Sequence, residues 1–316
     1  MSSSETVLPS VSAARKQSAI TEANALWLII GIMIAIDAVW ARLSGIGVSL
    51  GPAFVVGLTT LVALYLIYTR LRPNRHIAQF ALTSMQLVAF TAAGTVVVYL
   101  TVTSKFPLID RQLETADAAI GFNWLAYFDW VKDHPALDRA LGIAYDSSIF
   151  EIFLLLVILN VTGRFEQARD FTWLFVLTLL IIIVFAWLFP AESAWVHFGV
   201  VARVDAYHLA DFTALRAGQM KEIVLAKANG LITFPSFHAA LALILIIATR
   251  RTFLFPIFLP VNVLMIVSAL TSGGHYLIDI FAGLAVVPVA ALINQSLKRQ
   301  TEATGFEGRR RLDEAL

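Results

Sequence analysis

The sequence predicts an all-α membrane protein, folded as a polytopic bundle of about eight transmembrane helices. Hydrophobic residues make up 59% of the 316 positions and charged residues only 14%, against about 25% in an ordinary soluble domain. Apolar stretches of about 20 residues, long enough to cross a hydrocarbon core about 30 Å thick, recur along almost the whole chain. This pattern leaves no room for a separate soluble domain.

Eight apolar stretches account for the expected spans. They cover approximately residues 24–43, 48–69, 77–103, 141–162, 170–190, 235–249, 252–271 and 275–297. The sixth is short for a span, and the eighth begins with a histidine. Two longer connections, 104–140 and 191–234, mix charged with aromatic residues, which predicts short helices along the membrane interface.

Polar segments flank the spans and divide the chain into four regions. We expect residues 1–23, which begin with a serine-rich stretch, to form a disordered cytoplasmic tail. The apolar run that follows is too long for a signal peptide and is interpreted as an uncleaved first span. Residues 24–140 then hold the N-terminal transmembrane helices and an outside connection, 141–297 a membrane domain that carries the motifs described below, and 298–316 a second cytoplasmic tail.

The distribution of Lys and Arg indicates how the chain is oriented. With the amino terminus in the cytoplasm, 14 of the 23 Lys and Arg residues fall on the inner side and 9 on the outer side, although the outer loops are much longer. Because cytoplasmic loops carry the excess of Lys and Arg in membrane proteins, we expect both termini to be cytoplasmic and the two long connections to face outward. The expected location is the plasma membrane or an inner membrane.

Composition also limits the chemistry. The chain has no cysteine, which excludes disulfides, thiolate nucleophiles and cysteine metal sites. Histidines and carboxylates must therefore perform any catalysis. The net charge of +1 is scattered over short loops, so no nucleic acid partner is expected.

The first segment that suggests chemistry is Phe-Pro-Ser-Phe-His-Ala-Ala, residues 234–240, at the start of the sixth span. Proline fits the first turn of a helix. The N–H groups of Ser236, Phe237 and His238 would then lack a carbonyl one turn back, which suits a phosphate, and the Ser236 hydroxyl adds a donor. The alternative is a capped helix start that carries an interfacial histidine.

The second segment is Gly-Gly-His-Tyr-Leu-Ile-Asp, residues 273–279, at the start of the eighth span. A separation of four residues puts His275 and Asp279 on one helix face. An intramembrane carboxylate usually has a partner. A carboxylate that accepts a proton from one imidazole nitrogen leaves the other nitrogen free to attack an electrophile or to bind a metal. This spacing alone also arises often by chance.

The expected topology brings the two segments to one side of the membrane. His238 and His275 both begin spans that descend from the outer face. Two imidazoles and a carboxylate could therefore converge there. In that arrangement one histidine attacks phosphorus and forms a phosphohistidine, while the other protonates the departing oxygen.

These two segments carry a family resemblance. FPSFHAA, followed about forty residues later by GGHYLIDIFAG, resembles the type 2 phosphatidic acid phosphatase superfamily. The closest branch is the inositol phosphorylceramide synthase-like (inositolphosphotransferase) one. The resemblance is strongest over about 215–283, and it extends more weakly to the stretches around Asp110-Arg111 and 121–124.

The resemblance implies roles for particular residues. It implies a helical membrane fold in which 141–297 is the catalytic domain. His275 would be the nucleophile, Asp279 would orient it, and His238 would be the general acid. Ser236 and nearby amides, including that of Phe237, would hold the phosphate. The chemistry would need neither a metal nor a cofactor.

The chain departs from the wider superfamily in its cations. The superfamily's first motif, a lysine followed seven residues later by Arg-Pro, has no match, and the arginine expected six residues before the nucleophile falls on Ala269, although the serine beside it matches Ser268. Other cations must then meet the phosphate charge. Arg216 is the first candidate and Lys221 the second, both in the outer loop before the first segment. The alternative for each is an interfacial cation that contacts lipid headgroups.

Other polar residues receive structural interpretations. Four lie within the expected spans, and we expect them to bond neighbouring helices: Asp37, Asp146, Glu151 and Asn160. Residues 145–147 could instead line the substrate cavity. Four histidines lie in loops without partner spacing and are expected at the surface: His76, His134, His197 and His208.

The leading hypothesis is an integral membrane lipid phosphatase or phosphotransferase that acts at the outer face. Its partners would be a lipid phosphate or phospholipid substrate and the surrounding membrane lipids. Release of the phosphohistidine to water makes a phosphatase, whereas release to a polyol such as inositol or to a lipid alcohol makes a transferase. An inositol phosphorylceramide synthase-like headgroup transferase is the narrower alternative, since acceptor choice depends on pocket shape.

Two hypotheses from other classes stay open. A transporter could use the intramembrane carboxylates to relay protons or bind ions, but it would predict paired repeats with broken helices. A metalloenzyme could hold zinc or iron with His238, His275 and Asp279. The anion-binding helix start favours phosphate over either.

Overall fold

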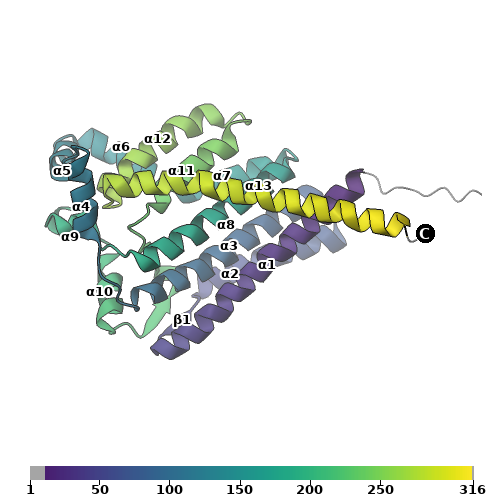
Figure 1. The fold of residues 1–316 in the computed structure, drawn as a ribbon, viewed down its shortest axis with the longest axis horizontal. Helices are drawn as coiled ribbons and strands as arrows, with labels where there is room; N and C mark the ends of the chain where they lie inside the picture. The colour runs from purple at the N-terminus through teal and green to yellow at the C-terminus, as the bar shows by residue number, and fades with distance from the viewer. Residues whose placement is uncertain (1–10, 315–316) are drawn as a thin grey trace, which may run out of the picture.

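The computed structural model describes the backbone of residues 11–314 and the side chains of residues 22–300. It confirms an all-α polytopic bundle (Figure 1). Six described helices are long and apolar enough to cross a membrane: α1 (Val11–Ser44), α2 (Pro52–Leu66) with its π-helical continuation η1 (Ile67–Leu71), α3 (Arg75–Val102), α8 (Phe165–Leu188), α12 (Phe255–Ser272) and α13 (Leu277–Glu314).

The other two expected spans are irregular. The fourth is a pair of helices, α6 (Pro135–Asp146) and α7 (Ser148–Val161), bent by 48° at Ser147. The sixth is α11 (Phe237–Thr249), which has 13 residues, fewer than the roughly 20 that a full crossing needs. Among the described residues, six helices are long enough to cross, or seven with the bent pair, and α11 is a further, shorter apolar helix, which is consistent with the expected count of about eight.

Both expected tails are partly helical. Helix α1 begins at Val11, inside the stretch 1–23 expected to be disordered, and α13 continues to Glu314, through most of 298–316. Both extensions are rich in Ala, Gln, Glu, Lys and Arg, which favour helix even without packing. Residues 1–10 and 315–316 of the expected tails lie outside the described residues.

The two long connections contain short helices, as expected. The first holds α4 (Asp110–Ala119) and α5 (Trp124–Lys132). The second holds α9 (Ala194–His197), η2 (Val201–Arg203), α10 (Leu209–Ala217) and η3 (Leu225–Lys227). Helices α4, α5, α9 and α10 gather at one end of the molecule, and the last turns of α13 lie at the other (Figure 1).

A small parallel sheet, which the sequence did not predict, joins two loops at the same end. Strand β1 (Gly47–Ser49) follows α1, and it pairs with β2 (Glu222–Val224) of the second connection, with Gly47 opposite Glu222. The loop between α1 and α2 therefore lies on the same face as both long connections. This placement agrees with helices that alternate in direction along the chain.

The packed core lies among α3, α8, α11 and α13, whereas α2 has no buried side chain. Of the polar residues expected within spans, Glu151 accepts hydrogen bonds from Ser147 and from Asn262 of α12, so it does bond a neighbouring helix. The Asn160 amide donates to a carbonyl within its own helix. Asp37 is buried, and Asp146 is exposed.

Candidate active site

Helix α11 begins beneath the second long connection, and Ser236 caps it. The Ser236 hydroxyl accepts a hydrogen bond from the Ala239 N–H at 3.4 Å. The Ser236 N–H, which we expected to be unpaired, donates to the main-chain oxygen of Asp279 at 3.0 Å. Within the described part of the chain, the N–H groups of Phe237 and His238 have no partner. Two amides at this helix start are thus available to an anion.

A close helix crossing holds the two motif segments together. A Cβ added at Gly283 of α13 would overlap the main-chain oxygen of Ser236. Only glycine allows the backbones to approach this closely. The start of α13 is consequently fixed against the start of α11.

His275 is buried, and its orientation is set mainly by the backbone. Its Nδ1 lies 2.7 Å from the carbonyl oxygen of Thr233 and 3.5 Å from Oδ2 of Asp279. Because a carbonyl oxygen only accepts hydrogen bonds, Nδ1 carries the proton, and Nε2 keeps its lone pair. The Thr233 carbonyl is a site group that no sequence pattern reveals, since every residue has one.

Asp279 is fully buried beside His275. Its Oδ2 accepts a hydrogen bond from the Tyr276 N–H at 2.8 Å, and its Oδ1 has no partner among the described residues. The expected pairing with His275 is therefore present at ion-pair distance, with a main-chain donor supporting the carboxylate.

His238 stacks on an aromatic ring from the bent helix pair. The rings of His238 and Tyr145 are 4.0 Å apart between centroids, with 23° between their planes. His238 also lies close enough to His275 for their charges to interact. A Cβ on Gly273 would come within 2.8 Å of the Tyr145 hydroxyl and 2.7 Å of the His275 ring, so glycine is required there. The structure thus brings His238, His275 and Asp279 together.

Helix α4 supports the second motif segment, residues 273–279, from outside the spans. The two Asp117 oxygens accept hydrogen bonds from the N–H groups of Leu277 and Ile278, each at 2.8 Å, at the start of α13. Burial raises the pKa of Asp117, and these two donors lower it in part. Such a cap from a distant helix was not predicted, because it depends on tertiary contact.

Two further groups hold the same segment. Asp110 accepts a hydrogen bond from the Tyr276 hydroxyl at 3.1 Å. The indole N–H of Trp124 donates to the main-chain oxygen of His275 at 2.8 Å. Both come from the upstream stretches that resembled the superfamily only weakly.

His208 is a third histidine near the site, contrary to the expectation that it lies at the surface. It is only 4% exposed. Burial lowers its pKa, a hydrogen bond to the Glu192 carbonyl raises it in part, and the nearby His275 lowers it further. His208 is buried because the second long connection folds over the site and covers its own residues. His197, in the same connection, is exposed as expected.

The expected phosphate cations do not contact the histidines. Arg216 donates from Nη1 to the Phe106 carbonyl at 3.1 Å and lies over the Phe212 ring. It does line a small pocket together with Thr233. Lys221 is exposed beside the small sheet, and its carbonyl accepts a hydrogen bond from the Gly47 N–H.

The side chain of Phe237 points into the core. Its ring meets Phe175 of α8 edge-on, with 5.4 Å between centroids. Only the Phe237 N–H is therefore placed to meet a phosphate. Among the described residues, no three His, Asp or Glu side chains form a group that could hold a metal ion.

The comparisons with known proteins agree with this geometry. The family model of the PAP2 superfamily matches residues 111–293, more than half of the chain, and the match includes both motif segments and most of α4. No curated protein and no solved structure matches the chain significantly. Members of the superfamily are phosphatases or phosphotransferases that act on phosphate esters. The chain is therefore an integral membrane enzyme that belongs to the PAP2 superfamily.

Proposed function

We propose that this enzyme transfers the phosphoryl group of a lipid to Nε2 of His275. The observation that carries the proposal is the contact between His275 Nδ1 and the Thr233 carbonyl, which leaves Nε2 as the free nucleophilic nitrogen. His238 lies nearby as a second imidazole. The superfamily's activity on lipid phosphates supports this choice of substrate class.

In the first step, Nε2 of His275 attacks phosphorus, and the bond from phosphorus to the lipid oxygen breaks. His238 gives its proton to that oxygen, so the leaving group departs as a neutral alcohol. The Tyr145 ring, stacked on His238, fixes the orientation of the imidazole. Asp279 offsets the positive charge that develops on the His275 ring.

In the second step, the phosphohistidine is released. An incoming hydroxyl group gives its proton to His238 and attacks phosphorus, and the phosphorus–nitrogen bond breaks. Water as acceptor yields inorganic phosphate, whereas a polyol or a lipid alcohol yields a new phosphodiester or phosphomonoester, depending on the group transferred. Both outcomes return His275 and His238 to their starting states.

The phosphate would be bound mainly by the start of α11. The free N–H groups of Phe237 and His238 supply donors there, and the helix dipole favours an anion. Ser236 fixes the helix start through its cap. We propose that Arg216 leaves the Phe106 carbonyl and meets the phosphate when a lipid binds, with Lys221 as a more distant cation.

Charge distribution supports an orientation. The end of the molecule opposite the histidines carries Lys and Arg in every short loop: Arg70, Arg72, Arg164, Arg250 and Arg251 among them. By the positive-inside rule this end faces the cytoplasm. We therefore propose that both termini are cytoplasmic and that the active site opens at the other face of a plasma or inner membrane.

The second candidate function is transfer of an inositol phosphate-type headgroup to a lipid alcohol. It is favoured by the upstream stretches that resemble the inositol phosphorylceramide synthase-like branch. Asp110 and Trp124 of these stretches contact Tyr276 and His275 directly. The acceptor present in the assay distinguishes this candidate from hydrolysis.

The proposal is tested with purified protein and a panel of lipid phosphates, lipid diphosphates and phospholipids, with and without inositol or diacylglycerol. We expect phosphate release or transfer that survives chelators and is blocked by vanadate. Acid-labile labelling of the protein by a radioactive phosphoryl group should occur in the wild type and be absent in His275→Asn. Full turnover by a folded His275→Asn protein would overturn the mechanism.

A further inference from the structure

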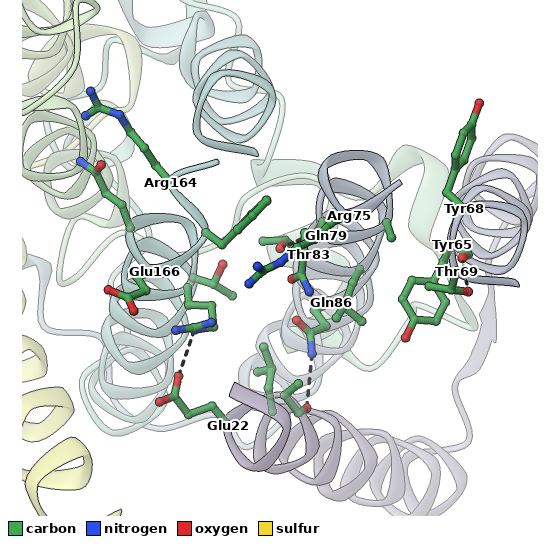
Figure 2. Close-up of a pocket in the computed structure, with 18 of the residues that line it drawn as sticks. Glu22, Tyr65, Tyr68, Thr69, Arg75, Gln79, Thr83, Gln86, Arg164 and Glu166 are labelled. Atoms are coloured by element: carbon green, nitrogen blue, oxygen red, sulfur yellow. Dashed lines mark hydrogen bonds and ion pairs between the residues drawn. The ribbon is translucent and has the colours of Figure 1, made fainter. Parts of the chain in front are cut away.

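A second cavity lies at the end of the molecule opposite the histidines. It is lined by the ends of α1, α2 with η1, α3 and α8 (Figure 2), it is open on one side, and its volume is about 1270 Å³. Ordinary small-molecule sites measure about 300 to 1,000 Å³. No residue of the proposed catalytic group lines it.

One wall of this cavity is a polar stripe on a membrane-spanning helix. Gln79, Thr83 and Gln86 follow one another along the cavity side of α3 in Figure 2. Their spacing of four and three residues places them on one helix face. Gln86 donates to the Ala23 carbonyl at 3.3 Å, whereas the Gln79 side chain has no partner among the described residues. The Gln79 amide is therefore available to a polar occupant or to water.

Charged residues of both signs line the cavity. The lining includes three arginines and two glutamates: Arg75, Arg164, Arg169, Glu22 and Glu166. Arg169 pairs with Glu22 at 3.4 Å. In the described part of the chain, Arg75 has no carboxylate partner, and its guanidinium lies 4.6 Å from the centre of the Phe165 ring. Arg75 is therefore a cation held in place but not neutralised.

The remaining walls of the cavity are apolar. Leu26, Trp27, Leu82 and Trp173 line the cavity. Helix α2, which closes one side, has no buried side chain, so its outer surface is exposed to lipid. Tyr65 of α2 and the two tryptophans are residue types that concentrate where membranes meet water. An occupant can thus place a charged head at Arg75 and apolar chains among these walls.

We propose that this cavity binds one anionic phospholipid from the leaflet on this face. The phosphate lies at Arg75, the glycerol region contacts Gln79 and Thr83, and an acyl chain runs along α2. A soluble anion would leave the apolar walls in contact with water, and a zwitterionic lipid would bring its own cation to Arg75. The bound lipid is separate from the lipid consumed at His275, which lies at the opposite end of the spans.

The anionic leaflet supplies the ligand. Anionic lipids give the cytoplasmic surface a negative potential that attracts Lys and Arg near the membrane. A lipid seated between α1, α2, α3 and α8 fills space that protein side chains leave open. We therefore expect bound anionic lipid to stabilise the protein, because a ligand that binds only the folded state raises its stability.

The test is native mass spectrometry of the detergent-solubilised full chain, titrated with phosphatidylglycerol or with phosphatidylcholine of the same acyl chains. We expect one tightly retained phosphatidylglycerol and at least about tenfold weaker retention in Arg75→Ala, since a charge-assisted contact is lost. Arg72→Ala is the matched control: Arg72 is exposed three residues before Arg75 and does not line the cavity. It should bind like the wild type.

Two more variants extend the test. One changes the cavity without changing Arg75, and the other separates lipid binding from the proposed catalysis. Ala78→Phe fills the cavity from α3 and should also reduce retention, with thermal melting to check folding. His275→Asn should bind phosphatidylglycerol normally, so loss of the proposed catalysis and loss of this site are separate results. Equal retention of both lipids, unchanged binding by Arg75→Ala, or displacement of the lipid by millimolar inorganic phosphate would each overturn the proposal.

Discussion

The nearest partner of the His275 Nδ1 atom is the main-chain oxygen of Thr233, at 2.7 Å. The Asp279 carboxylate is farther away, at 3.5 Å. The tautomer of the proposed nucleophile is therefore set by a carbonyl that no substitution removes. This geometry assigns Asp279 a mainly electrostatic effect, which can be measured separately from orientation.

Replacing Asp279 by Asn should accordingly slow turnover by less than the roughly 10⁴-fold seen where a carboxylate alone fixes the histidine tautomer. The Thr233 carbonyl still holds the Nδ1 proton in this variant. The measurement is kcat on a lipid phosphate, beside His275→Asn. A loss as complete as that of His275→Asn would show that Asp279 does fix the tautomer.

His238→Asn should lower kcat on an alkyl lipid phosphate by about 10² to 10⁴, the usual effect of removing a general acid. The loss should be much smaller on an aryl phosphate, because a phenolate leaves without being protonated. His197→Asn is the control, since His197 is exposed in the neighbouring connection. Equal losses on both substrates would rule His238 out as the acid.

His208 predicts an effect of pH on stability. Its pKa is lowered in the folded protein, mainly by burial, so the unfolded chain binds more protons as the pH falls below about 6.5. The free energy of unfolding is therefore not reduced by His208 above that pH, and it decreases as the pH falls below it. His208→Gln should flatten the decline in melting temperature between about pH 7.5 and 5. An unchanged decline would contradict this account.

Arg216→Ala should raise KM and lower kcat more than Lys221→Ala does. A guanidinium holds two phosphate oxygens at once, and losing one such donor commonly costs about 2.7 to 4 kcal/mol. Arg216→Lys should recover only part of the activity. The prediction is tested by steady-state kinetics of the three variants, with melting curves to confirm folding. Wild-type kinetics in Arg216→Ala would show that Arg216 does not contact the phosphate during turnover.

The proposed orientation is testable by labelling, because the chain has no cysteine. Gln219→Cys, beside α10, should react with an impermeant maleimide added outside cells. Arg72→Cys, at the opposite end, should react only after permeabilisation. Both positions are exposed, so access to reagent differs only by membrane side. The reverse pattern would invert the topology.

The sequence predicted the fold well where the signal was local. A span is recognisable from about 20 consecutive apolar residues, and every expected span corresponds to a helix or a helix pair. The bend at Ser147 was missed, although it falls at three consecutive polar residues, 146–148, because polar residues also occur within unbroken spans. Strands β1 and β2 have three residues each, and their pairing joins positions far apart in the chain.

The candidate site, too, was predictable only where the signal in the sequence was local. His238, His275 and Asp279 were identified because their spacing follows helix geometry and resembles a known family. Thr233 was not, because it acts through its backbone, nor was His208, because its burial depends on how a long connection folds. The unpaired state of the Ser236 N–H was predicted wrongly, because its acceptor lies on another helix.

The two hydrogen bonds from α13 to Asp117 define where this enzyme can be divided. Helix α4 lies before the bent pair in the chain, yet its carboxylate supports the start of α13, next to the proposed nucleophile. A fragment that starts at residue 141 would expose the amides of Leu277 and Ile278 and lose the indole that holds the His275 carbonyl. The smallest portion that could be exchanged between relatives, or expressed alone, must therefore begin before Asp110.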